Sequence, residues 1–131
     1  MPQPIINAKG VNKSYTMGEQ KLHVLKDVDF SVSEGEMVAI VGSSGSGKTT
    51  MLNCLSALDD IDSGEVVIDS IDIHNMKDHK RAAYRANNMS FIFQSFNLIP
   101  VLTAYENVEM PLLLTKLSKE EMAKRVNNAL E

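Results

Sequence analysis

The stretch Gly42-Ser43-Ser44-Gly45-Ser46-Gly47-Lys48-Thr49 decides the fold of this 131-residue chain, because it matches G-x-x-x-x-G-K-[ST] at every fixed position. An apolar run of strand length, 36–41, comes directly before it, and segment 50–58 carries apolar residues at helical spacing directly after it. This order of strand, glycine-rich loop and helix is typical of a phosphate-binding loop. The alternative, a Ser/Gly-rich linker with a chance lysine, is disfavoured because the motif matches at every fixed position and also has a strand-like segment before it and a helix-like segment after it.

The chemistry of the loop predicts a nucleotide. Glycines let consecutive backbone N–H groups turn inward, and the helix N-terminus adds about half a positive charge facing the phosphates. Lys48 can reach the β- and γ-phosphates, and the Thr49 hydroxyl can complete a Mg²⁺ shell. The expected phosphate-binding residues are Gly42, Ser43, Ser44, Gly45, Ser46, Gly47, Lys48, Thr49 and Thr50.

Length and composition bound the remaining possibilities. The chain is one domain's worth of sequence, and its net charge of −4 with pI near 5.3 argues against a nucleic-acid-binding surface. The N-terminus lacks the pattern of a secretory signal, and no apolar run is long enough to span a bilayer. The lone Cys54 is expected to be a small buried apolar residue in a reducing compartment, a reactive thiol being the minor alternative.

The pattern along the chain predicts strands and helices in succession. An edge strand over 5–13, a strand over 22–32 and a hairpin of 65–68 with 71–73 are expected before a buried strand at 89–93. Helices are expected at 76–88, with a solvated basic face, and at 103–115 and 118–130, the last with a capping box of Ser118 and Glu121.

Several separate stretches resemble the ATP-binding subunit of ABC transporters. Val11-Asn12-Lys13-Ser14-Tyr15 resembles the family's A-loop, and Phe91 to Pro100 resembles its Q-loop, with Gln94 at the glutamine position. Asp62 to Val66 is similar to the turn into the antiparallel sheet, and Thr103 to Val108 is similar to the start of the helical subdomain. The stretches Phe96 to Pro100 and Glu106 to Val108 most resemble the subgroup for lipoprotein release and macrolide-type export.

The resemblance implies an α/β P-loop NTPase fold, the ABC-ATPase core, with an antiparallel β-subdomain and P-loop core over 1–93 and the start of the helical subdomain over 94–131. ATP and Mg²⁺ are the implied cofactors. Tyr15 would stack on adenine, Lys48 and Gln94 would act in catalysis, and Thr49 and Gln94 would face the metal. The implied partners are a second ATP-binding subunit and a transmembrane permease subunit, which would hold the protein at the cytoplasmic face of the membrane.

The apolar loop that contains Phe96, Leu98 and Ile99 would then receive a helix of that membrane partner, the alternative being that these side chains pack under the helices.

The family also uses a Leu-Ser-Gly-Gly-Gln-type signature, a Walker B Asp followed by a catalytic Glu, and a switch His after the Q-loop. Here the last glycine is Gly64 and the last histidine is His79. We therefore expect the N-terminal part of a longer ATPase that binds nucleotide without appreciable turnover. The alternatives are a non-hydrolysing nucleotide-binding module and a soluble ABC protein of DNA repair or translation.

Overall fold

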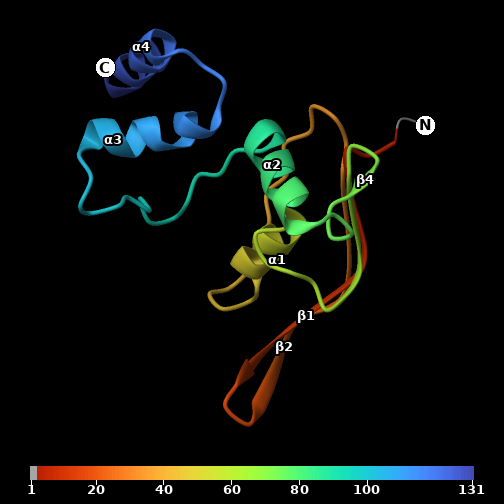
Figure 1. Ribbon diagram of the computed structural model, residues 1–131. Coiled ribbons are helices and arrows are strands. Elements are labelled where there is room, and N and C mark those ends of the chain that lie inside the picture. The colour runs from red at the N-terminus through yellow and green to blue at the C-terminus, as the bar shows by residue number, and fades with distance from the viewer. Residues whose placement is uncertain (1–2) are drawn as a thin grey trace. The chain divides into compact units, whose positions relative to one another are not determined.

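The computed structural model describes residues 3–131, which form two compact units, 3–90 and 91–131 (Figure 1). The boundary predicted from the sequence, between 93 and 94, lies three residues after this division. Among the described residues, no helix is both long enough and apolar enough to cross a membrane.

The first unit contains a four-stranded antiparallel sheet in the order β2-β1-β3-β4 (Figure 1). Its strands are β1 (Ile6–Met17), β2 (Gln20–Val32), β3 (Ser63–Ile68) and β4 (Ile71–Asp72). The expectation that the first strand lies at an edge is wrong, because β1 pairs with β2 on one side and with β3 on the other. The expected hairpin is confirmed, with β3 and β4 joined through Asp69 and Ser70.

Two helices accompany this sheet, α1 (Lys48–Leu55) and α2 (Asp78–Asn88). Helix α1 buries Met51, Cys54 and Leu55 in the same apolar core as the strand residues Val11 and Val66. Leu52, which the helical spacing places on the buried side, is 57% exposed. The buried face of α1 is therefore narrower than the sequence predicts.

The two apolar segments 36–41 and 89–93 were expected to be strands, and the structure assigns neither to the sheet. Ile92 is 102% exposed, so the burial expected for 89–93 is also wrong, and Met37 in segment 36–41 is 98% exposed. Within residues 3–131 neither segment has a strand beside it to accept and donate its backbone hydrogen bonds. Apolar composition alone does not make a strand, because a strand exists only with a paired neighbour.

The basic face predicted on α2 is only partly solvated. Arg81 bridges the carboxylates of Asp60 and Asp78, each at 2.7 Å, and Arg85 donates to the carbonyl oxygen of Ala57 at 2.7 Å. Both arginines therefore tie α2 to the segment that follows α1. The sequence does not reveal these contacts, because Asp60 lies 21 residues before Arg81 and Ala57 lies 28 residues before Arg85.

The second unit contains α3 (Ala104–Glu109), the short 3-10 helix η1 (Met110–Leu114) and α4 (Lys119–Leu130). Thr103 and Glu106 form a capping box at the start of α3. The side-chain amide of Asn107 donates to the carbonyl oxygens of residues 99, 102 and 103 and accepts from the N–H of Ile99, which holds the preceding loop against α3.

Only half of the capping box predicted for α4 forms. The Ser118 hydroxyl accepts from the N–H of Glu121 at 3.2 Å, as expected. The Glu121 carboxylate instead accepts from Arg125 at 3.2 Å, one helical turn later. The two arrangements compete for one carboxylate, and the charged partner prevails.

Candidate functional site

The phosphate loop of the sequence forms the start of helix α1. Gly47 occupies the N-cap position with φ of 96°, and no side chain caps the helix. The first turn of α1 contains no acidic residue. The N–H groups of this turn therefore remain available to an anion, and the helix dipole adds partial positive charge at the same point.

The path of the loop requires glycine at two positions. A Cβ on Gly42 would lie 2.7 Å from the Ser46 hydroxyl oxygen, and a Cβ on Gly47 would lie 2.9 Å from Cγ1 of Val24 on β2. The φ of Gly47 also lies in the left-handed region, which L side chains rarely adopt. Side chains at these positions would fill the cradle or push it away from the sheet, so the loop is shaped for a ligand that approaches backbone atoms closely.

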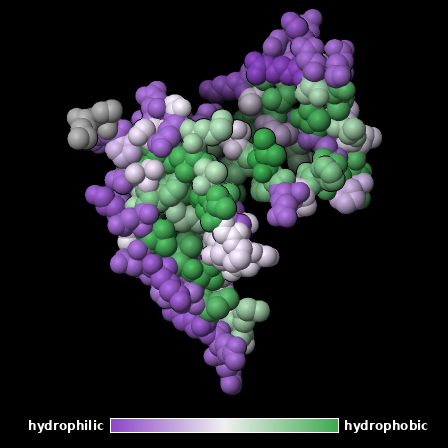
Figure 2. All heavy atoms as spheres, turned by 180° about the vertical axis from the view of Figure 1, so that it is seen from behind, coloured by the Kyte–Doolittle hydropathy of each residue, from purple (hydrophilic) through white to green (hydrophobic). Residues whose placement is uncertain are grey.

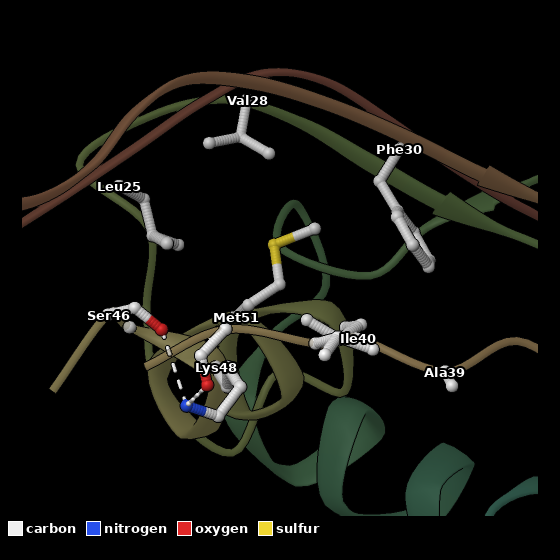
Figure 3. Close-up of a pocket in the computed structure, with 11 residues that line it drawn as sticks. Leu25, Val28, Phe30, Ala39, Ile40, Ser46, Lys48 and Met51 are labelled. Carbon is white, nitrogen blue, oxygen red and sulfur yellow. Dashed lines mark hydrogen bonds between the residues drawn. The ribbon is translucent and has the colours of Figure 1, made fainter. Parts of the chain in front are cut away.

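The ammonium group of Lys48 lies within the loop (Figure 3). Its Nζ donates to the carbonyl oxygen of Ser43 at 2.7 Å, to that of Gly42 at 3.0 Å and to the Ser46 hydroxyl at 3.3 Å. These contacts aim one positive charge at the centre of the loop. They are also exchangeable, because an anionic oxygen is a stronger acceptor than a neutral carbonyl.

The other predicted site residues lie as follows. Thr49 is exposed in the first turn of α1, and Thr50 beside it is half-buried. Gln94 lies in an exposed bend of the second unit. The structure thus brings the loop residues 42–50 together in one unit, while the role of Gln94 toward nucleotide stays a prediction.

A hollow of about 450 Å³ adjoins the loop (Figure 3). Leu25, Val28 and Phe30 of β2 form one wall, and Ile40 and Met51 face them. Charged or polar groups reach it only from the loop itself, at Ser46 and Lys48. Such walls suit apolar packing rather than a triphosphate, so the phosphates are expected at the loop rather than in the hollow.

Apolar side chains also reach the surface of the first unit elsewhere. Val38, Leu52 and Leu58 are each more than two-fifths exposed. Figure 2 shows a band of hydrophobic residues along this unit, bordered by hydrophilic ones. The first unit thus exposes apolar side chains beyond those that line the hollow.

Tyr15, the residue expected to contact adenine, lies half-buried on β1 in a polar cluster. Its hydroxyl donates to the Asp59 carboxylate at 2.6 Å, and the same carboxylate accepts from Lys13 at 2.8 Å. The Lys13 ammonium also lies over the Tyr15 ring, 5.1 Å from its centroid. Lys13 donates further to the carbonyl oxygen of Asp60 at 2.6 Å.

The cluster shifts the ionisation of its members. The hydrogen bond to Asp59 and then burial raise the pKa of Tyr15, while a hydrogen bond from Thr50 acts in the opposite direction. Burial opposes charge on Asp59 and Lys13, but their mutual hydrogen bond and attraction prevail, so the pKa of Asp59 is lowered and that of Lys13 is raised. At neutral pH the cluster is a neutral phenol between a carboxylate and an ammonium.

The sequence reasoning identified Tyr15 but missed Lys13 and Asp59. One signal was available: Lys13 and Tyr15 are two residues apart on a strand, which places them on the same face. Nothing comparable indicates Asp59, which lies 44 residues from Tyr15 and joins it only through the fold.

Fold and loop together define a P-loop nucleotide-binding protein, and the comparisons identify its family. The family model of the ABC transporter matches residues 25–131. An ABC transporter ATP-binding protein of Methanocaldococcus jannaschii, MJ0796, is 45% identical over 130 residues, which cover 97% of this chain and 55% of that protein. The macrolide export ATP-binding/permease protein MacB of Neisseria gonorrhoeae is 39% identical over 127 residues, covering 97% of this chain and 20% of that protein.

A solved structure agrees with these matches. The dimeric post-hydrolysis state of the MJ0796 cassette, bound to ADP and Pi, aligns with a TM-score of 0.87 and 45% identity over 95% of this chain and 55% of that one. The chain therefore belongs to the ABC transporter family and has the fold of the part of its ATP-binding domain that it matches. It spans about half the length of the ATP-binding proteins it matches. The match to MacB agrees with the export subgroup that the sequence resembles.

Proposed function

We propose that this chain binds Mg·ATP and Mg·ADP through the loop 42–50. The observation that supports this most directly is the position of the Lys48 ammonium, 2.7 Å from the Ser43 carbonyl oxygen and inside a loop that excludes side chains at Gly42 and Gly47. The N–H groups at the start of α1 and Lys48 hold the phosphates. Thr49 would supply a hydroxyl ligand to the Mg²⁺, whose charge would neutralise the phosphate oxygens.

In the whole ABC protein, we propose that the bound ATP is hydrolysed in a dimer and that hydrolysis drives export through a transmembrane permease subunit. The related MJ0796 cassette is a dimer with ADP and Pi, which supports the dimer, and the relative MacB is named for macrolide export. Gln94 is the proposed contact to the γ-phosphate and the metal. The 131 residues contain no glycine after Gly64 and no histidine after His79, so the chain alone is proposed to bind without appreciable turnover.

We also propose that the loop around Phe96 contacts the permease. Phe96 is 93% exposed and Leu98 is 64% exposed, which supports a surface that a partner covers over the alternative of packing under the helices. In the transporter, Phe96→Ala is expected to weaken association with the permease while ATP affinity stays unchanged. Equal affinity for the permease in this variant would contradict the proposal.

The nucleotide site is tested by isothermal titration calorimetry of the chain with Mg·ATP. Lys48→Ala is expected to raise the Kd at least tenfold, because it removes charge-assisted hydrogen bonds worth about 1.5–3 kcal/mol each. Lys21→Ala, at an exposed lysine of β2, is the matched control and is expected to bind as the unchanged chain does. Equal Kd values for the Lys48 and Lys21 variants would refute the proposed function.

A further inference from the structure

The polar cluster beside β1 connects Tyr15 to the helix that carries the phosphate loop. Helix α1 begins in the loop at Lys48, and its Asn53 carbonyl oxygen accepts from the N–H of Asp59 at 3.2 Å. The Asp59 carboxylate in turn accepts from the Tyr15 hydroxyl at 2.6 Å. A continuous series of hydrogen bonds therefore leads from the end of α1 to the Tyr15 ring.

The same cluster places a cation over one face of the ring. The Lys13 ammonium lies over the ring, 5.1 Å from its centroid, and is held there by Asp59 and by the Asp60 carbonyl oxygen. The Lys13 side chain is only 10% exposed, so it is confined to this position. A base that stacks on Tyr15 must use the face that Lys13 does not cover.

Asp59 is the residue that fixes both neighbours. One carboxylate oxygen binds the Tyr15 hydroxyl and the other binds Lys13, so a single side chain contacts both the ring's hydroxyl and the cation that lies over the ring. Since the N–H of Asp59 is bonded to the Asn53 carbonyl oxygen in the last turn of α1, this residue links the helix to the ring. A ligand that contacts both loop and ring requires their spacing to be constant.

We propose that Asp59 is a positioning residue for nucleotide binding, which holds the Tyr15 ring at a set distance from the phosphate loop with one face open to the adenine base. The inference rests on the proposed function, and it adds a residue that acts through Tyr15 without touching the ligand. Its consequence is selective: losing Asp59 weakens binding of ligands with a base and leaves binding of the phosphate chain alone unchanged.

The experiment compares two ligands, Mg·ATP and Mg·tripolyphosphate, which lacks the base. Asp59→Ala and Tyr15→Phe each remove one partner of the same hydrogen bond, and Tyr15→Phe keeps the stacking ring. Both variants are expected to raise the Kd for Mg·ATP about fivefold and to leave the affinity for tripolyphosphate unchanged. A change of about fivefold corresponds to part of the binding free energy that base–aromatic stacking contributes. The double variant is expected to lose no more than Asp59→Ala alone, because Asp59→Ala already removes the bond that Tyr15→Phe cuts.

Asp60→Ala is the matched control, because its carboxylate is the next along the chain and pairs with Arg81 rather than with Tyr15. It is expected to leave both Kd values unchanged. Unchanged ATP affinity in Tyr15→Phe, or an equal loss for both ligands in Asp59→Ala, overturns the inference while the proposed function stands. Absence of Lys48-dependent ATP binding in the unchanged chain overturns the proposed function and the inference together.

Discussion

Gly47 lies against Val24, because a Cβ added to Gly47 would meet Cγ1 of Val24 at 2.9 Å. The phosphate loop therefore enters helix α1 in direct contact with β2. The glycine motif has two roles at this position, since it leaves room for phosphate and lets the loop approach the sheet closely.

Replacing this glycine is expected to destabilise the fold as well as the site. Gly47→Ala combines a left-handed φ of 96° with the contact to Val24, while Gly18→Ala has a comparable positive φ of 63° but nothing within 4 Å. We expect Gly47→Ala to lose about 2 kcal/mol more of the free energy of unfolding than Gly18→Ala, measured by urea denaturation. Adding Val24→Ala is expected to recover part of this difference. Equal losses in the two glycine variants would show that the contact is relaxed at no cost.

The stability contributed by the Lys13–Asp59–Tyr15 cluster is expected to depend on pH. The folded-state pKa of Asp59 is lowered, so its contribution is present above its unfolded value near 4 and is lost as pH falls through the folded value. The folded-state pKa values of Tyr15 and Lys13 are raised, so their contributions are present below about 10 and are lost as pH rises through the folded values.

The measurement is thermal unfolding of the unchanged chain and of Asp59→Asn from pH 3 to pH 11. The stability difference between them is expected to be largest between about pH 4 and pH 10. Glu65→Gln, at an exposed carboxylate of β3, is the control and is expected to show no such window. A difference that stays constant down to pH 3 would contradict the assignment to Asp59.

Cys54 is expected to resist alkylation in the folded chain. Burial, followed by the nearby charge of Asp59, raises the pKa of its thiol to about 11, and its side chain is fully buried. At pH 8 it therefore has neither the thiolate form nor the access that iodoacetamide requires. Mass spectrometry is expected to show labelling only after denaturation. Rapid labelling of the native chain would support the alternative of a reactive thiol.

Truncation of two apolar side chains of the second unit is expected to change the free energy of unfolding by very different amounts. Val126 on α4 is fully buried, so Val126→Ala is expected to cost about 2 kcal/mol of unfolding free energy. Phe96 is 93% exposed, so Phe96→Ala is expected to change this energy by less than about 0.5 kcal/mol. Urea unfolding followed by helical circular dichroism measures both. A large loss in Phe96→Ala would mean that this ring packs within the protein.

The sequence predicts the hairpin, the helix starts and the glycine-rich loop as structural elements, because their signals are local. The loop 42–50, the hairpin around Asp69 and Ser70 and the start of α4 at Ser118 each depend on residues a few positions apart. Pairing and long-range contacts are not encoded locally. The central position of β1, the lack of pairing at 36–41 and the role of Asp59 beside Tyr15 all depend on chain segments far apart, so no pattern indicates them.

The central position of β1 also has a consequence for synthesis. The partners of β1 on its second side, such as Ile68 opposite Ile6, leave the ribosome after β1 and β2. The β1–β2 hairpin can form at once, but until β3 arrives it presents an open strand edge with Ala8 and Val11 unburied. An edge of this kind can pair with other nascent chains, so the interval between the emergence of β2 and that of β3 exposes this protein to aggregation.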